Sequence, residues 1–429
     1  MTQIKLGGLV AAATLVVAIS FPSHSAEWFD GRVKVDLNML QGFQALDADS
    51  DVFFAGDDDP DSGFLRTRFN MSLTIEFTDW ITGFIDLAEE PNDFGQNGFA
   101  ITDDLSFMDF SLLDAFDSPL AENNTLILRV GEPVAVLFQY RGYSDGAQTH
   151  GNPLIANSPY DMVTPDTGAE LLGHHEFGTA YFSALDWDLT VGTPNFFEDF
   201  ADERGYHVTA KASIDILPAD SEYGALSIGG GWSYNDASDQ LFSNGGPQPL
   251  PSGATAMVGG DGENIRFPSA GIGGVRNTHA GLLPGIELNL YQINVMYKPN
   301  FVPLRLIGFY GGGKDEFSFV NAAGAQTVRS QSGTVNSIQS EVAAWGIEAT
   351  YDIIPDLLYV AGRFTQVSNE SDGIAVTGSM ERFQIGGGVW LADNVLLKVE
   401  YIHQSEEAGS PGQIGDDWRA GLVEVSAAF

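Results

Sequence analysis

Short segments in which apolar and polar residues alternate recur along most of this chain. In RTRFNMSLTIEF, residues 66 to 77, polar residues occupy every second position from Arg66 to Glu76, and bulky apolar residues fill alternate positions from Phe69 to Phe77. Successive side chains of a β-strand point to opposite faces, so the pattern predicts strands with one apolar and one polar face. A soluble sheet would alternate in the same way, and the length, number and spacing of the segments must therefore decide the fold class.

The segments have the length and number expected of a membrane-spanning barrel. RVKVDLNML (32 to 40), YHVTAKASIDI (206 to 216) and VLLKVEY (395 to 401) repeat the pattern, and a tilted strand needs roughly 9 to 11 residues to cross a bilayer. About sixteen segments can be counted, an even number as in single-chain bacterial barrels. The predicted strands begin near residues 31, 63, 80, 102, 124, 176, 186, 205, 223, 284, 301, 337, 355, 378, 393 and 417.

The connections between the predicted strands are short and long in turn. Short ones are predicted at Thr78-Asp79, Asp186, Lys298-Pro299-Asn300, Pro355-Asp356 and Ala392-Asp393-Asn394, and long ones at 42 to 62, 134 to 168, 236 to 283 and 313 to 336. This order predicts a transmembrane antiparallel β-barrel with short periplasmic turns and long extracellular loops. Because backbone groups cannot stay unpaired in hydrocarbon, the first strand should pair with the last.

Aromatic residues next to the short turns predict an interfacial girdle. The residues are Phe77, Trp80, Trp187, Tyr297, Tyr351 and Trp390.

Residues 1–25 have the features of a secretory signal peptide. Lys5 precedes an apolar run from Leu9, and small residues from Ser23 to Ala26 allow cleavage after Ser25 or Ala26. The run is shorter than the roughly 20 residues that span a membrane. The chain has no cysteine, so an exported protein of this kind lacks disulfides and needs a large core or a lipid-embedded surface. No linker interrupts the pattern, and we expect residues 26–429 to form a single all-β barrel.

The C-terminal residues resemble a known signal. GLVEVSAAF ends in Phe429 and has Val423, Val425 and Ala427 on one face, which is similar to the C-terminal assembly signal of outer-membrane porins. With its signal peptide, strand number and long fifth connection, the chain resembles the sixteen-stranded porins over nearly its whole length. LRVGEPVAVLFQYRGYSDG, NPLIANSPY and TPDTGAELLG are similar in layout to the phosphate-selective-type porins.

The resemblance implies a location, partners and a constriction. We expect a homotrimer in the bacterial outer membrane, inserted by the barrel assembly machinery and in contact with outer-membrane lipid and lipopolysaccharide. The connection at 134–168 is expected to fold inward as the constriction. No cofactor and no nucleic-acid partner are expected.

Acidic residues outnumber basic ones, 58 to 19, and the formal net charge is −39. Alternation nevertheless places about half of the bases on the predicted lumenal face, where they avoid the cost of facing lipid. These bases are Arg32, Lys34, Arg66, Arg68, Arg129, Lys211, Arg305, Arg363, Arg382 and Lys398. Acids on the same face are Asp36, Glu76, Asp86, Asp109, Asp188, Asp215, Glu348 and Glu400.

The remaining acid surplus falls mostly in loops such as 47 to 61. It predicts an acidic vestibule that enriches small cations, above a mixed-charge lumen that admits small hydrated solutes.

Nine residues are predicted to line the pore, because an inward loop should lie against the early strands. They are Lys34, Arg66, Arg68, Glu76 and Arg129 on strands, with Arg141, Asp145, Asp161 and Asp166 in the loop. Asp47, Asp49 and Asp51 have the spacing that opens a calcium loop, but Val52 stands at the glycine position and no Glu closes the loop. They are weak candidates for loose binding of a divalent cation, and no firm metal site is predicted.

The sequence therefore favours a passive diffusion channel for small hydrophilic solutes and ions. A substrate-selective porin for anions or sugars is one alternative. A plugged structural or adhesive barrel is another, favoured if the connection at 236 to 283 fills the lumen. An outer-membrane enzyme is not expected, because no Ser, His and acid set is apparent.

Overall fold

The computed structural model describes most of the chain between residues 26 and 429. The described ranges are 26–28, 31–48, 62–89, 102–132, 134–136, 152–155, 163–179, 181–194, 206–236, 286–318, 328–330, 333–335, 337–372, 378–406 and 417–429. The signal-peptide prediction for 1–25, the connection at 236 to 283, and Asp49, Asp51, Arg141, Asp145 and Asp161 lie outside these ranges.

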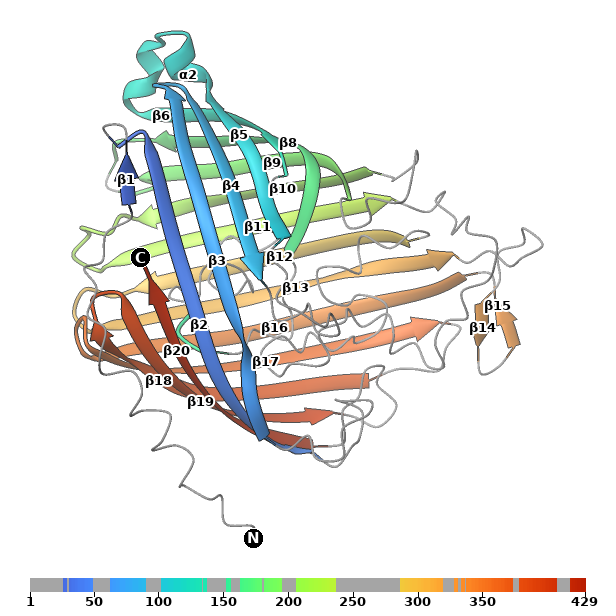
Figure 1. Cartoon of the computed structure of the whole chain (residues 1–429). Helices are drawn as coiled ribbons and strands as arrows, with labels where there is room; N and C mark the ends of the chain where they lie inside the picture. Colours follow the sequence, from blue (N-terminus) through green and yellow to red (C-terminus); the bar gives the residue numbers. More distant parts are fainter. Residues whose placement is uncertain are drawn as a thin grey trace.

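Within the described residues, sixteen long strands form one closed antiparallel sheet (Figure 1). They are β2 (Val33–Ala48), β3 (Ser62–Thr78), β4 (Ile81–Glu89), β5 (Thr102–Ser111), β6 (Asn124–Gly131), β8 (Val163–Glu176), β9 (Ala184–Pro194), β10 (Tyr206–Leu217), β11 (Ala225–Asp236), β12 (Ile286–Lys298), β13 (Leu304–Ser318), β16 (Ser337–Ile354), β17 (Leu358–Asp372), β18 (Gly378–Ala392), β19 (Val395–Glu406) and β20 (Asp417–Ala428). The prediction of an all-β barrel is confirmed.

The barrel closes between its first and last long strands, as predicted. β2 pairs with β20 from Asn38 opposite Ala428 to Ala48 opposite Trp418. The short β1 (Ala26–Trp28) pairs with Val33–Val35. β3 pairs with the opposite edge of β2 at these residues. β1 therefore lies on the same edge of β2 as β20 and extends the β2–β20 seam beyond the end of β20.

Three short strands complete the described sheets. β7 (Val134–Val136) pairs with β8 beyond the end of β6. β14 (Val328–Ser330) and β15 (Gly333–Val335) form a separate hairpin.

The sixth predicted strand is wrong. A strand was expected to begin near 176, but β8 ends at Glu176, and Asp186, predicted as a turn, lies inside β9 opposite His174. The segment VTPDTG, 163 to 168, resembles a loop because of Pro165 and Gly168, yet Pro165 pairs only with the short β7 and Gly168 pairs with Gly131. The connection predicted at 134–168 therefore has strands at both of its ends.

The other predicted strand starts lie within a few residues of the observed ones. The connection between β5 and β6 differs from a simple short turn, since it contains α2 (Leu112–Ala115) and the 3-10 helix η2 (Pro119–Glu122). In Figure 1, α2 lies at the same rim as the C-terminus. No helix among the described residues is long and apolar enough to cross a membrane.

Along the strands the apolar side chains are exposed and the polar ones between them are buried, which is the reverse of the pattern in a soluble protein. On β18, Phe383 is 45% exposed and Ile385 is 51% exposed, whereas Arg382 and Gln384 between them are at 0%. Backbone polar groups are all paired in a closed barrel, and an apolar outer surface can then face lipid. The apolar face therefore lies outside the barrel and the polar face inside.

The predicted aromatic girdle is correct at the exposed Phe77, Trp80 and Tyr351. It is wrong at Trp390, which packs against a buried cluster that includes Leu396. The register shifts between Trp390 and Ala392, and such an irregularity breaks the alternation from which the outward position was predicted.

Candidate functional site: the barrel interior

Residues 152–155 lie against the inner wall formed by β17, β18 and β19. Leu154, 1% exposed, packs with Tyr359, Ala361 and Leu396, and Trp390 lies against this cluster. Burial of a leucine side chain contributes about 1.5 to 3 kcal/mol. The apolar contact therefore contributes to holding this segment on the wall.

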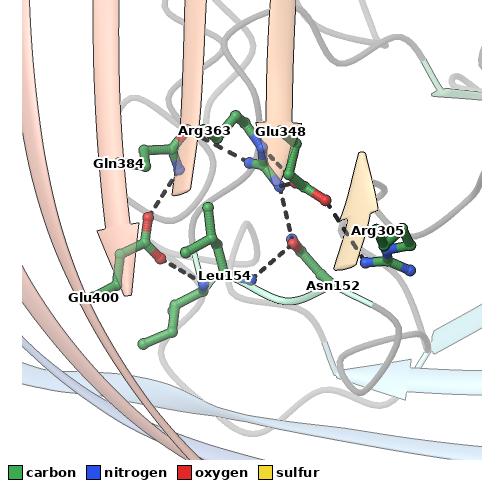
Figure 2. Close-up of polar contacts among 8 residues, drawn as sticks. Asn152, Leu154, Arg305, Glu348, Arg363, Gln384 and Glu400 are labelled. Atoms are coloured by element: carbon green, nitrogen blue, oxygen red, sulfur yellow. Dashed lines mark hydrogen bonds and ion pairs between the residues drawn. The ribbon is translucent and has the colours of Figure 1, made fainter. Parts of the chain in front are cut away.

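Polar contacts clamp the same segment on both sides of Leu154 (Figure 2). Arg363 donates from Nη2 to Asn152 Oδ1 at 3.0 Å. The backbone N–H of Ile155 donates to Glu400 Oε2. Asn152 Oδ1 also accepts from the Leu154 backbone N–H at 3.1 Å, which turns the segment back on itself. We call residues 152–155 and these partners the clasp.

The clasp joins distant parts of the barrel. Residues 152–155 follow β7 and precede β8, whereas their partners lie on β17 to β19. In the closed strand order β8 and β18 are on opposite sides of the barrel, as Figure 1 shows. The chain between Val136 and Val163 therefore reaches the far inner wall.

The wall behind the clasp carries a network of charged and amide side chains. Glu348 accepts from Arg363 Nε and Nη2 at 3.0 and 2.9 Å, and Arg305 Nη2 lies 3.6 Å from its other oxygen. Gln384 Nε2 donates to Glu400 Oε1 at 2.8 Å. The two carboxylates that flank the clasp are thus oriented by neighbouring strands.

Two further buried pairs lie on the same side of the barrel. Arg382 Nε donates to Gln404 Oε1 at 2.7 Å. Lys398 Nζ lies 3.1 Å from Glu424 Oε1, and their side chains are 1% and 0% exposed. A buried ion pair is costly to break, because either partner alone would be an uncompensated charge.

On the other side of the barrel, Arg129 is held by two carboxylates. Its Nε and Nη2 donate to the two oxygens of Asp109 at 2.8 and 2.9 Å, and Nη1 donates to Glu170 Oε2 at 3.2 Å. Lys211 and Asp188 form a separate pair at 2.8 Å. The guanidinium is therefore fixed in position and its charge is more than balanced locally.

The early strands carry polar contacts on the same inner face. Lys34 Nζ lies 3.3 Å from Glu76 Oε1, and both side chains are substantially exposed, at 41% and 45%. Asp86 accepts from Asn70 at 2.6 Å and from Ser72 at 2.8 Å, and it is only 2% exposed. Solvent thus reaches the Lys34 and Glu76 pair but hardly reaches Asp86.

The structure describes the side chains of three predicted pore residues. Lys34, Glu76 and Arg129 have the contacts given above, whereas only the backbone is described at Asp47, Arg66, Arg68 and Asp166. Asp166 belongs to β8, opposite Pro194, and not to the loop. The register shifts where Leu40 pairs with Arg68 and Gly42 with Leu65, so strict alternation does not extend from Arg68 to Arg66.

Several interior residues were not predicted as part of a site. Asn152, Glu170 and Glu424 have no distinctive motif around them, although Glu424 alternates with valines in GLVEVSAAF. That alternation was a signal for an inward carboxylate. Among the described residues, no group of three His, Cys, Asp or Glu could hold a metal ion.

Comparison with known proteins finds likeness in structure alone. No family model matches the chain, and no curated protein matches it. The outer membrane channel DcaP of Acinetobacter baumannii is 11% identical, and the match covers 94% of this chain and 99% of that one with a TM-score of 0.50. The chain has the fold of the outer-membrane porins.

Two other porin structures match over similar lengths. OmpT of Vibrio cholerae is 9% identical, over 95% of this chain and 100% of that one, with a TM-score of 0.49. An anion-selective porin from Comamonas acidovorans is 11% identical, over 92% and 99%, with a TM-score of 0.48. At these identities the likeness concerns the fold and not the transported solute.

The outer surface determines where such a barrel resides. Exposed apolar residues such as Ile347 and Val399, at 51% and 47%, need a hydrocarbon surrounding. Closed barrels of this architecture span the bacterial outer membrane. The protein is therefore an outer-membrane β-barrel with a porin-like fold.

Proposed function

We propose that this protein is a passive diffusion channel for small hydrophilic solutes and ions. The clasp is the observation that carries the proposal. A segment fixed against the inner wall by both apolar and polar contacts is suited to setting the width of a passage through the barrel. Residues 152–155 would narrow such a passage on the side of β17 to β19.

The distribution of charge supports a preference for cations. On β2 to β10 the described inward carboxylates outnumber the inward Lys and Arg side chains, whereas on β13 to β20 the two kinds are equal in number. The first group comprises Asp36, Glu76, Asp86, Asp109, Glu170, Asp186, Asp188 and Asp215 against Lys34, Arg129 and Lys211. The second comprises Glu348, Asp352, Glu400 and Glu424 against Arg305, Arg363, Arg382 and Lys398.

A passage lined by side chains of both signs favours hydrated, polar solutes. The side opposite the clasp is the acidic one, so we expect small cations to be enriched along that wall. A homotrimer in contact with lipopolysaccharide, and insertion by the barrel assembly machinery, remain predictions from the sequence resemblance. An enzymatic role forms no part of the proposal.

Planar-bilayer recording of the purified full-length protein tests the proposal. We expect stepwise conductance, and in a salt gradient a reversal potential of the sign that cations produce. Absence of conductance from correctly folded protein would reject the channel function. A reversal potential of the opposite sign would reject only the cation preference.

A second function, a plugged structural or adhesive barrel, is favoured by the burial of inward polar side chains around the barrel. Asn70, Thr190, Gln292 and Thr365 lie on four widely separated strands, and each is at most 1% exposed. A wide water-filled lumen would leave such side chains exposed. A barrel that folds normally but never conducts, even with the clasp removed, would have this second function.

A further inference from the structure

Two aromatic side chains face the interior on the side opposite the clasp. On β4, Phe84 shares its face with the buried Asp86, while Ile85 between them is 41% exposed on the outer surface. On β5, Phe107 shares its face with Asp109, and the intervening Met108 is 39% exposed. Because these rings lie on the inner, polar face of the barrel, they do not contact lipid. Their presence there needs another explanation.

The two rings form an ordered stack with the guanidinium of Arg129. Phe84 and Phe107 are direct cross-strand partners, with ring centroids 4.9 Å apart and planes inclined by 21°. Arg129 Cζ lies 3.8 Å from the centroid of Phe107. Since β4 and β6 lie on opposite sides of β5, Phe107 is held between Phe84 and a cation.

The ring of Phe84 has a second face, on the side away from Phe107. Its partner in the next strand is Thr74, a small side chain that leaves room beside the ring. Phe84, Phe107 and Thr74 are all half-buried, in contrast to the nearly inaccessible Thr365 and Gln384 on the clasp side. A solute in the passage can therefore reach this part of the wall.

Carboxylates lie on both sides of the two rings along the strands. Asp86 follows Phe84 along β4, and Glu76 and Asp109 lie in the adjacent row of cross-strand pairs through Thr82. An aromatic ring face attracts cations, and nearby carboxylates strengthen the attraction in a partly desolvated site. The guanidinium of Arg129, already stacked on Phe107, is an internal example of this preference.

We infer that Phe84 and Phe107, with the carboxylates around them, form a binding subsite in the passage for organic cations that carry a flat aromatic ring. The ring of the solute stacks on Phe84, and its positive charge lies toward Asp86 and Glu76. The inference deepens the proposed channel function, because the subsite would hold solutes on their way through the passage. A mere packing role for the two rings would give no selectivity among solutes.

Binding to the full-length protein in detergent provides the first test. Calorimetry with benzyltrimethylammonium is compared with tetramethylammonium, which lacks the ring, and benzoate, which has the opposite charge. We expect benzyltrimethylammonium to bind most tightly. Equal binding of benzoate, or equal binding of tetramethylammonium, would overturn the inference on the unmodified protein alone.

A pair of matched variants provides the second test. Phe84→Leu keeps an apolar side chain but removes the ring face, and Phe383→Leu makes the same change on the outer surface. We expect Phe84→Leu to weaken benzyltrimethylammonium binding about two- to fivefold, and Phe383→Leu to leave it unchanged. Equal affinities in the two variants would contradict the assignment.

Single-channel recording separates this inference from the channel function. We expect benzyltrimethylammonium to interrupt the current briefly in the unmodified protein and less in Phe84→Leu. Conductance without selective interruption would reject the subsite and leave the channel. Ring-dependent binding without any conductance would reject the channel and leave the subsite.

Discussion

Arg363 and Asn152 are hydrogen-bonded at 3.0 Å, although 211 positions separate them in the chain. The bond joins a strand of the barrel wall to a segment that lies between β7 and β8 in the chain. It is buried, and Arg363 also donates to Glu348. The width of the passage should therefore depend on this bond and on the apolar contact of Leu154 next to it.

Releasing the clasp should widen the passage. Asn152→Ala removes an acceptor from a charged donor, at a cost of about 1.5 to 3 kcal/mol, and Leu154→Ala removes about 2 to 5 kcal/mol of packing. We expect the double variant to show larger or noisier single-channel currents. Ile385→Ala, on the lipid-facing surface, serves as the control, and unaltered currents in the double variant would contradict the role of the clasp.

Neutralising Arg129 should increase the preference for cations. Arg129→Gln leaves Asp109 and Glu170 without their basic partner, so the wall becomes more negative and the reversal potential in a salt gradient should shift toward the cation limit. Asp109→Asn should shift it the other way. The same measurement on Arg66→Gln and Arg68→Gln tests the predicted pore residues, and no shift would remove them from the constriction.

Replacement of only one partner of the Lys398–Glu424 ion pair should lower the stability of the barrel strongly. Lys398→Met leaves a buried carboxylate unpaired, and we expect the free energy of unfolding to fall by about 3 to 5 kcal/mol. Lys398→Met with Glu424→Leu should recover most of the loss. Urea titration in detergent micelles measures both, and a double variant less stable than the single one would contradict this account.

The C-terminal Phe429 should matter for closure of the barrel. Its backbone N–H and C=O both bond to Leu37, at 2.7 and 2.9 Å, at the end of the β2 and β20 seam. We expect deletion of Phe429 to lower the fraction of folded, membrane-inserted protein, measured by heat-dependent migration in gels. Removal of residues 26–28 is the comparison for the other part of the seam, and equal insertion with and without Phe429 would refute its role.

The sequence predicts the barrel well because alternation is a local property with a physical cause. Segments such as 395 to 401 place Val399 outside and Lys398 inside, as the structure does. The strand β12 keeps a continuous register with both neighbours, although its apolar residues change from one face at Leu288 and Leu290 to the other at Tyr291 and Ile293. Leu290 is an apolar residue on the inner face, where it is 3% exposed, and its hydrophobicity alone would place it on the wrong side.

Features that depend on long-range packing were not predictable in the same way. The place of Trp390 depends on an irregular register at the end of β18. β8 begins in a segment whose proline and glycine suggested a loop. To predict the clasp, one would have to know that Asn152 contacts Arg363 and that Ile155 contacts Glu400. Neither pair has a local signature in the sequence.

Single-channel recording of the purified protein in a salt gradient tests the central claim most directly. The account predicts discrete conductance steps with a cation-selective reversal potential, and larger or noisier steps when Asn152 and Leu154 are both replaced by alanine. A folded barrel that stays electrically silent in both the unmodified and the double-variant forms would contradict it.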